Sequence, residues 1–486
     1  MSTLTRAAGR PTIGNRPRVS TPTSDRRERR LGLGMAAVLL VDAALHLYWA
    51  TGAVWPAPDE FSLSVAVLGF GVDFRPGLLI PLAVLVSVGA GLVAARALLG
   101  RGHRLGLLWQ LGTAAVTAGV LTRGLLGVLW AIPATGHLPD GFYWINLLAY
   151  TPLCLAMAIA GFRLLRPARA TGWRRTVAVR TWALALPVVL VALLVYGAYG
   201  LTPRVVEDYA PVHGLGGLQS QYVDTELARF HYVQHGQGSP VVLLSPGAAW
   251  ISSWLPQIRA LAADHTVYAV DLPGQGFTDL HDEEFRFDLP GMTSAVQTFL
   301  DAVGLERTAL AGSSWSGGWA LSFAQQHPER VSRLMLLAPS GLDRPDPTSW
   351  EMLKLPVIGR ALTRLGASSR ATADSSLESL FVHDDRITDE LAEGFFAAQT
   401  RPDNVRSMYE LQARLDWSTV EAGLATTEQP TLVLWGGQDS VLPVDRAAVF
   451  GQLLPNATVR VFDDCGHGLP LDCPGRISTQ MVEFLP

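Results

Sequence analysis

Three residues far apart in the chain carry side chains that together can attack a carbonyl group. Ser314 supplies a hydroxyl, Asp439 a carboxylate and His467 an imidazole, in that chain order. A serine hydroxyl is a weak nucleophile until an imidazole takes its proton, and a carboxylate can hold that imidazole in the required tautomer. The sequence therefore predicts catalysis through an acyl-enzyme. We find no histidine, cysteine and acid cluster with metal spacing and no nucleotide loop, so we expect no metal and no cofactor.

The residues around Ser314 predict a tight turn between a strand and a helix. Small residues, Gly312 and Ser316, lie two positions before and two after it, as a sharp turn requires. Ser316 is an alternative nucleophile, because Ser314 and Gly318 would then be its small neighbours. The end of the predicted strand 309–312 favours Ser314.

The acid and the base each follow a predicted late strand. Asp439 comes after strand 431–435, and His467 comes after strand 458–462. The carboxylate would orient the imidazole, which would act first as general base and then as general acid. Asp343, after an earlier strand, is a weaker candidate for the acid.

An acyl-transfer site also needs main-chain donors for the negative charge that develops on the carbonyl oxygen. We expect one from the N–H of Trp315, directly after the nucleophile, and one from the N–H of Ala248, in Ser-Pro-Gly-Ala. Losing one such donor raises the barrier by about 3 kcal/mol.

Two cysteines flank the predicted base. Cys465 and Cys473 lie on either side of His467. They can form a disulfide that pins the histidine loop, or they can be two buried thiols, and the sequence leaves both open. Cys154 lies in an apolar helical stretch.

The first 200 residues predict a membrane domain. A hydrocarbon core about 30 Å thick needs roughly 20 apolar residues in a helix. Five stretches qualify, at about 31–52, 77–98, 105–131, 143–165 and 180–200. The apolar run 61–70 is too short to span and would be interfacial or packed in the bundle.

Arginine placement predicts the orientation of these spans. Residues 1–205 hold 20 arginines and 7 acidic residues, and 17 of those arginines fall before the first span or in the second and fourth connections. Positive residues favour the cytoplasmic side. We therefore expect a cytoplasmic N-terminus and, after five spans, an extracytoplasmic segment from residue 201. A cleaved export signal is the less favoured reading of the first span.

Three ionisable residues fall inside the predicted spans. Asp42 and His46 share one helical face, and Arg123 lies in the middle of the third span. Charges in lipid usually pair inside the bundle. They can form a proton or ligand site, or a structural lock between helices, and we favour the lock.

The remaining chain predicts alternating strands and helices, typical of a mostly parallel sheet. We expect a disordered basic segment at 1–30, the membrane domain at 31–200, a linker at 201–220 and a globular domain at 221–486. The stretch of about 341–428 is helical and too long for a crossover, which predicts a cap over the site.

Residues 221–486 resemble the α/β-hydrolase superfamily, at the elbow 312–317, the acid loop 436–443, the histidine segment 465–468 and the turn 271–277. The resemblance implies a hydrolase with a Ser–Asp–His triad. The sequence departs from the family pattern in two places: Ser316 replaces the usual glycine, and Pro-Gly replaces the usual His-Gly before Ala248. We assigned the turn 271–277 a structural role only.

Residues of about 35–165 resemble a four-helix bacterial membrane family whose function is not established. The matching pieces are His46-Leu47-Tyr48-Trp49-Ala50-Thr51-Gly52, Arg123-Gly124-Leu125-Leu126-Gly127 and Tyr150-Thr151-Pro152-Leu153-Cys154-Leu155. The resemblance implies a helical unit, with the fifth helix as a stalk, and no activity.

The overall expectation is a five-helix transmembrane bundle followed by an α/β-hydrolase fold with a helical cap. Residues 206–486 hold 18 basic and 35 acidic residues, which argues against nucleic-acid binding. We expect a membrane-anchored serine hydrolase that acts on small apolar or lipid-like esters. The alternative class is a transporter or sensor with a non-catalytic ligand-binding domain. An aminopeptidase, a carbon–carbon bond hydrolase and a perhydrolase remain lesser alternatives.

Overall fold

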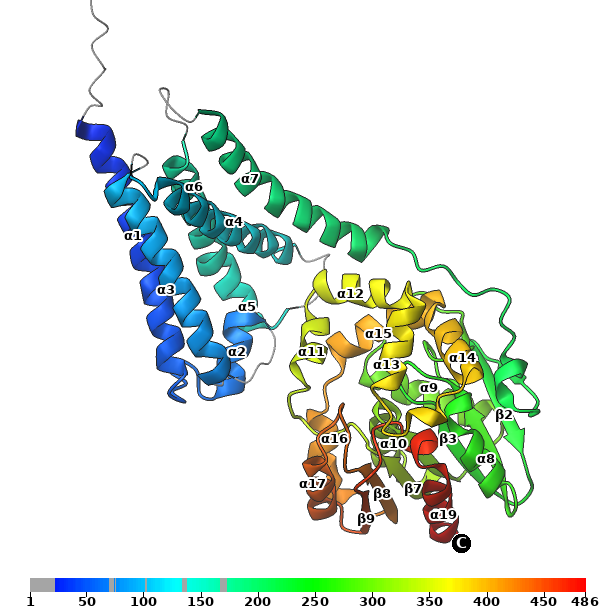
Figure 1. Ribbon diagram of the computed structural model, residues 1–486. Coiled ribbons are helices and arrows are strands. Elements are labelled where there is room, and N and C mark those ends of the chain that lie inside the picture. Colours follow the sequence, from blue (N-terminus) through cyan, green and yellow to red (C-terminus); the bar gives the residue numbers. More distant parts are fainter. Residues whose placement is uncertain (1–21, 70–73, 75, 101–102, 133–137, 167–172) are drawn as a thin grey trace, which may run out of the picture. The chain divides into compact units, whose positions relative to one another are not determined.

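The computed structural model describes residues 22–486, except 70–73, 75, 101–102, 133–137 and 167–172 (Figure 1). The chain divides into two compact units. One comprises Met1–Ala53, Phe74–Leu126 and Ala149–Val189, and the other comprises Val54–Asp73, Gly127–Leu148 and Leu190–Pro486.

Within the described residues, five helices are long and apolar enough to span a membrane. Their apolar residues are exposed over much of the helix surface, as lipid-facing residues are, and burial within each span involves a minority of positions. The helices of this part of the chain are α1 (Pro22–Trp49), α2 (Glu60–Leu68), α3 (Pro76–Leu99), α4 (Gly106–Trp130), α5 (Asp140–Ile145), α6 (Thr151–Leu164) and α7 (Trp173–Val195), with π-helical turns at Asn146–Tyr150 and Tyr196–Gly200.

The N-terminal segment that we expected to be disordered is helical where it is described. Residues 1–21 lie outside the described residues, and the remainder up to residue 30 forms the first turns of α1. Pro22 opens the helix, where its missing N–H costs nothing, and the arginines that follow at 26, 27, 29 and 30 have good helix propensity. The expectation of disorder was therefore wrong for residues 22–30.

The second unit is built around one mixed sheet, in the order β1-β2-β4-β3-β6-β7-β8-β9, with β5 paired to β2. From β4 through β9 along this order the neighbours run parallel, and β1, β2 and β5 pair antiparallel at one side. The strands are β1 (Gln221–Asp224), β2 (Ala228–His235), β3 (Ser239–Leu244), β4 (His265–Val270), β5 (Asp279–Leu280), β6 (Thr308–Ser313), β7 (Val331–Leu337), β8 (Thr431–Gly436) and β9 (Ala457–Phe462).

Helices flank this sheet and bury its apolar side chains. The central strands β3, β6 and β8 are almost entirely buried, because parallel strands are covered on both faces. The flanking helices are α8 (Leu255–Leu261), α9 (Leu289–Ala302), α10 (Trp315–Gln326), α17 (Asp445–Leu453), α18 (Leu469–Asp472) and α19 (Pro474–Phe484).

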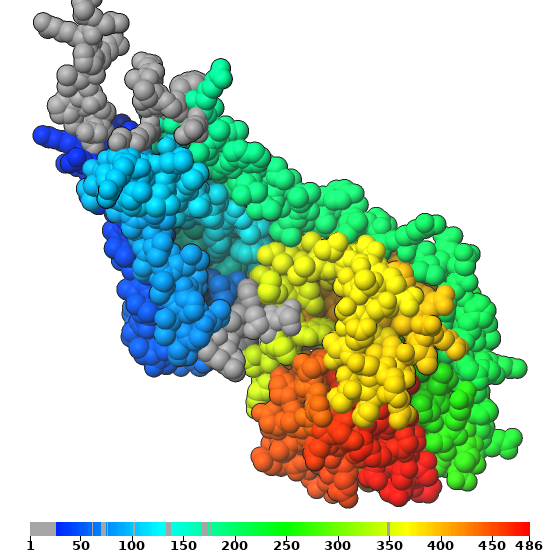
Figure 2. Space-filling view, in the orientation of Figure 1, coloured from blue at the N-terminus to red at the C-terminus, as the bar shows by residue number. Residues whose placement is uncertain are grey.

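A helical cap is inserted between β7 and β8, as the sequence predicts. It lies beyond one edge of the sheet in Figure 1, and its yellow surface adjoins the red C-terminal segments in Figure 2. Its helices are α11 (Thr348–Glu351), α12 (Ile358–Ala367), α13 (Arg370–Glu378), α14 (Asp389–Gln399), α15 (Pro402–Arg414) and α16 (Ser418–Gly423).

The segment 201–220, which we expected to be a linker, packs as part of the second unit. Leu215 is fully buried. The ring of Tyr209 stacks on Phe277 at 5.8 Å between centroids and meets Trp250 edge-on at 6.1 Å. Burial of aromatic rings contributes stability, so this segment is part of the folded unit rather than a free tether.

Candidate active site

The four predicted site segments meet at one edge of the sheet because they follow parallel strands. Ser314 follows β6, Ala248 follows β3, Asp439 follows β8 and His467 follows β9. The carboxyl ends of parallel strands share one edge, where ligands bind in open α/β sheets.

Ser314 lies at a strained turn between β6 and α10. Its backbone adopts φ 56° and ψ −126°, a conformation that costs free energy for a non-glycine residue and that often marks functional sites. Gly312 is required beside it, since a Cβ there would lie 2.3 Å from the carbonyl oxygen of Ser316. The turn projects Ser314 beyond the end of its strand.

Ser316, the alternative nucleophile, is fully buried. Its hydroxyl donates to the carbonyl oxygens of Ser313, at 2.9 Å, and Leu244, at 3.1 Å. It also accepts the N–H of Ser313 at 2.9 Å. The hydroxyl is therefore committed to holding the turn, and this favours Ser314 as the reactive serine.

Asp439 and His467 are joined by a hydrogen bond. The imidazole Nδ1 lies 2.8 Å from Oδ2 of the aspartate. The other carboxylate oxygen accepts the N–H groups of Val441 and Leu442, each at 2.8 Å. The Asp439 side chain is fully buried, so these bonds compensate for the loss of water around the charge. Asp343, the alternative acid, is exposed and is not among the residues that line the cavity of Ser314 and His467.

Ser314 and His467 line one cavity of about 460 Å³. No hydrogen bond joins their side chains within the described chain, and such contacts are commonly long before a substrate binds. The apolar lining comes mostly from the cap, including Leu377, Leu380, Phe381, Leu391 and Phe395.

The two predicted oxyanion donors differ in availability. Trp315, whose backbone N–H begins α10, lines the cavity. Ala248 also lines it, at φ 59°, but its N–H already donates to Oε1 of Gln275 at 2.6 Å. Gln275 is buried, and its Nε2 has no hydrogen-bond partner among the described atoms. Gln275 lies in the turn 271–277, to which we assigned a structural role only, so this contact was not predicted.

A buried carboxylate supports the loop in which Pro-Gly replaces the usual His-Gly. Asp271 accepts the Ser245 hydroxyl at 2.6 Å and the Ile251 N–H at 3.0 Å on Oδ1. Its Oδ2 accepts the Phe277 N–H at 3.0 Å and lies 2.8 Å from Nδ1 of His231. This network spans both ends of the Ala248 loop. The residues are positioning groups that sequence reasoning missed, although the turn from Asp271 was noticed.

Cys465 and Cys473 form a disulfide, with their Cα atoms 6.1 Å apart. The bond closes residues 465–473 around His467, within the histidine loop (residues 463–473). The guanidinium of Arg476 lies against both sulfur atoms and also binds Asp464 at 2.8 Å. This hydrogen bond from Arg476 lowers the pKa of Asp464.

The three membrane residues lie in the first unit. His46 Nδ1 lies 2.8 Å from the carbonyl oxygen of Asp42 and 3.7 Å from its carboxylate. Arg123 lies over the ring of Tyr150 at 5.6 Å. The sequence missed Arg96, which is buried and donates to the carbonyl oxygen of Leu164 at 2.6 Å. The Arg123 and Arg96 contacts join different helical elements, whereas the Asp42–His46 contact lies within α1.

Two family models match separate parts of the chain. Residues 239–474 match the one described as alpha/beta hydrolase fold. Residues 39–161 match the one described as Protein of unknown function (DUF3995). The two resemblances drawn from the sequence therefore cover the ranges in which we placed them.

Curated relatives match the second part of the chain over most of their own length. A 2-hydroxy-6-oxo-6-phenylhexa-2,4-dienoate hydrolase from Burkholderia cepacia is 30% identical over 271 residues, 53% of this chain and 91% of the relative. A 2-hydroxymuconate semialdehyde hydrolase from Pseudomonas sp. (strain CF600) is 28% identical over 263 residues, 51% of this chain and 88% of the relative.

A solved structure shows the same fold. The crystal structure of a putative lipase from Acinetobacter baumannii AYE superimposes with a TM-score of 0.50 at 22% identity, covering 56% of this chain and 92% of that chain. The likeness lies in the arrangement of sheet and helices.

Proposed function

The chain belongs to the α/β-hydrolase family, and we propose that it is a serine hydrolase, anchored by its apolar helices, that cleaves uncharged esters with apolar acyl groups. One observation carries the proposal. The imidazole of His467 is bonded to the buried Asp439 and faces the same cavity as Ser314, whose backbone is held in a strained turn.

The reaction follows from these roles. Ser314 Oγ attacks the ester carbonyl carbon while Nε2 of His467 takes the hydroxyl proton. The C=O bond opens to an oxyanion, which the Trp315 N–H stabilises at the positive end of α10. Collapse breaks the C–O bond, and His467 returns the proton to the leaving alcohol. Water, activated by His467, then releases the acid from Ser314.

The cavity lining supports an uncharged substrate. Among its described residues there is no lysine or arginine, and the acidic side chain it does contain is that of Asp346. The Burkholderia relative is named for a dienoate, which carries a carboxylate. A carboxylate held away from water needs a cation or several donors. The described lining offers neutral donors such as Asn404 but no cation, and the missing cation supports uncharged esters over carbon–carbon bond substrates of that kind.

Two features support an extracytoplasmic site. The arginines flanking the spans favour a cytoplasmic N-terminus, and five spans then bring the hydrolase unit to the opposite side. The Cys465–Cys473 disulfide belongs to an oxidising compartment. A substrate drawn from the adjacent membrane would suit the apolar cavity.

A fluorophosphonate probe tests the chemistry. The purified chain should be labelled, and Ser314→Ala should abolish labelling while Ser253→Ala, another serine on the cavity, should not. A folded protein that stays unlabelled would favour the sensor or transporter class. A membrane-impermeant probe on intact cells tests the orientation, since labelling only after lysis would mean a cytoplasmic site.

A panel of p-nitrophenyl esters tests the substrate class. Activity should rise from acetate to medium-chain esters as the acyl group fills the apolar cavity, and a monoester of similar length that ends in a carboxylate should be poor. Preference for the carboxylate ester would contradict the proposed selectivity.

A further inference from the structure

One turn of the cap is bonded to both loops that carry the acid and the base. The cap turn, Ser379–His383, follows helix α13. The hydroxyl of Ser440, next to Asp439, donates to the Ser379 carbonyl oxygen at 2.7 Å. The N–H of Gly468, next to His467, donates to the Leu380 carbonyl oxygen at 2.8 Å. The acid loop and the histidine loop therefore share a support outside the sheet.

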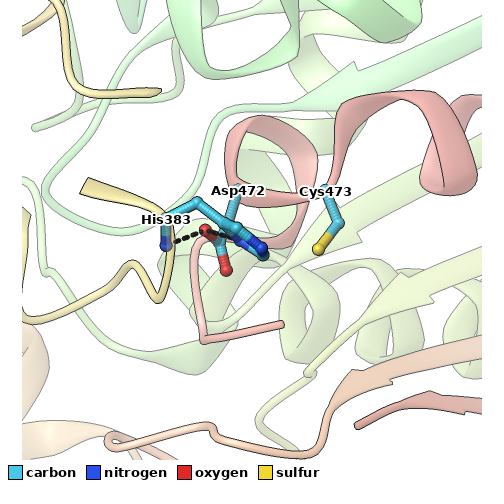
Figure 3. A group of neighbouring side chains, drawn as sticks. All are labelled: His383, Asp472 and Cys473. Atoms are coloured by element: carbon cyan, nitrogen blue, oxygen red, sulfur yellow. Dashed lines mark hydrogen bonds and ion pairs between the residues drawn. The ribbon is translucent and has the colours of Figure 1, made fainter. Parts of the chain in front are cut away.

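A buried carboxylate provides the rest of this junction. Asp472 lies on α18, and its side chain is fully buried. Its Oδ1 accepts the N–H groups of Val382, at 3.2 Å, and His383, at 2.9 Å, and lies 2.9 Å from His383 Nδ1 (Figure 3). Its Oδ2 accepts the N–H of Gly466 at 2.6 Å. Oδ1 therefore binds the cap turn, and Oδ2 binds the histidine loop.

The grouping of His383, Asp472 and Cys473 in Figure 3 has the residue types of a metal site. The Cys473 sulfur is bonded to Cys465, so it is no thiolate ligand. Three partners of Asp472 are backbone N–H groups, and the fourth is the ring Nδ1 of His383 at 2.9 Å. The carboxylate is saturated by donors and serves as a structural acceptor.

The contact between the cap turn and the histidine loop is close at the backbone. A Cβ on Gly466 would lie 2.6 Å from the Leu380 carbonyl oxygen. Leu380 and Phe381 also line the substrate cavity with His467. A substrate that fills the cavity would therefore contact the cap turn, whose Leu380 carbonyl oxygen accepts the N–H next to His467.

We propose that Asp472 is a positioning residue, which joins the cap turn to the histidine loop so that His467 is aligned only while the cap is seated over the cavity. The proposal rests on the proposed function of Ser314 and His467. Displacing a catalytic group by about 1 Å can cost a hundredfold in rate. Four bonds at Asp472 and one each at Gly468 and Ser440 oppose such a displacement.

The variant Asp472→Asn tests this with almost no change of shape. An amide has one accepting oxygen, so it can satisfy either Gly466 or the cap turn but not both. We expect kcat on p-nitrophenyl butyrate to fall about ten- to a hundredfold, with KM within about threefold, because the base is misaligned while the cavity is kept. Asp464→Asn is the matched control, since Asp464 lies in the same loop with its side chain 58% exposed. Asp472→Asn within about twofold of that control would overturn the proposal.

Ser440 and His383, two tethers that are less buried than Asp472, allow a second test if Asp472→Asn does not fold. Ser440→Ala and His383→Ala each remove one side-chain bond to the junction. Each single variant should lose less than about threefold in kcat, because the other tethers still hold the turn, and the double variant should lose at least about tenfold. If the loss in kcat of the double variant equals the product of the losses in the two single variants, the turn does not couple the two loops.

Amide hydrogen exchange separates this proposal from the proposed function. Asp472→Asn should speed exchange in the cap turn and in the histidine loop together, whether or not the parent reacts with a fluorophosphonate. A parent that stays unlabelled refutes the hydrolase reaction alone. Unchanged exchange in Asp472→Asn refutes the junction alone.

Discussion

Oε1 of Gln275 lies 2.6 Å from the amide nitrogen of Ala248, so one predicted oxyanion donor has a partner before any substrate arrives. A developing oxyanion must compete with this side chain. A neutral hydrogen bond contributes about 1 kcal/mol net, which corresponds to about fivefold in rate. Gln275→Leu should therefore raise kcat by about that factor with little change in KM, measured on a p-nitrophenyl ester.

Gln275→Glu gives the opposing variant. A carboxylate at the same place accepts more strongly than an amide oxygen and should lower kcat. If both variants lower kcat to the same extent, Gln275 supports the Ala248 loop and does not compete with the oxyanion.

Replacing the acid should separate catalysis from folding. Asp439→Asn keeps the shape of the side chain but no longer fixes the tautomer of His467, and in triads of this type the loss is about ten-thousandfold in kcat. Asp343→Asn, at the exposed alternative acid, should leave kcat within about twofold. A large loss of kcat in Asp343→Asn with little loss in Asp439→Asn would show that Asp439 is not the acid. Steady-state kinetics with a circular dichroism check of folding decides between them.

Removing the disulfide should cost stability. The bonded cysteines are 8 residues apart, and closing a loop of this length restricts the unfolded chain by about 2–3 kcal/mol. The variant Cys465→Ala with Cys473→Ala should lower the free energy of unfolding of the hydrolase unit by that amount in urea titrations. Adding reductant should destabilise the parent and leave the variant unchanged. A parent indifferent to reductant under unfolding conditions would argue against the bond.

Tyr209 should make the hydrolase unit sensitive to alkali. Burial, with Glu390 and Glu393 contributing, raises its pKa to about 12. In the unfolded chain the Tyr209 phenol ionises near pH 10. Its contribution to the free energy of unfolding is therefore fully present below about pH 10 and is lost as the pH rises toward 12. Tyr209→Phe should flatten that alkaline decline in thermal unfolding.

Tyr209→Phe should also be no less stable than the parent at pH 8, because the hydroxyl is buried without a hydrogen-bond partner among the described residues. Equal alkaline sensitivity in parent and variant would assign the effect to another group.

The sequence predicted the parts of the molecule that are set by local pattern. The elbow at Ser314 needs small residues at fixed offsets. The predicted strands 309–312 and 431–435 are apolar runs of the kind that fill a buried parallel sheet. The spans follow from length and hydropathy alone. The strands β1, β2 and β5 were missed. β1 has 4 residues and β5 has 2, too few for a pattern, and β2 mixes buried residues with the exposed Arg229, Gln234 and His235.

The positioning residues were not predictable, because their roles depend on partners distant in the chain. From the sequence, Asp472 is indistinguishable from an ordinary acidic residue in a turn. In the structure its carboxylate oxygen accepts backbone N–H groups from a cap segment some 90 residues earlier. Gln275 lies in a turn that matched the family, yet nothing in that turn indicates that its side chain reaches the Ala248 amide. His231 lies on a strand that was not predicted. The same limit applies to residues 201–220, because Trp250 and Phe277, the partners of Tyr209, lie in two loops that are distant in the chain.

The packing of residues 201–220 decides where the membrane part can be cut away. A soluble version that starts at residue 221 would bare the faces of Trp250 and Phe277 and lose the buried Leu215, and such exposed aromatic surface invites aggregation. A version that starts near residue 201 keeps residues 201–220 in place, but it still removes Val54–Asp73, Gly127–Leu148 and Leu190–Gly200 from the second unit. We therefore expect it to aggregate less than the version that starts at residue 221.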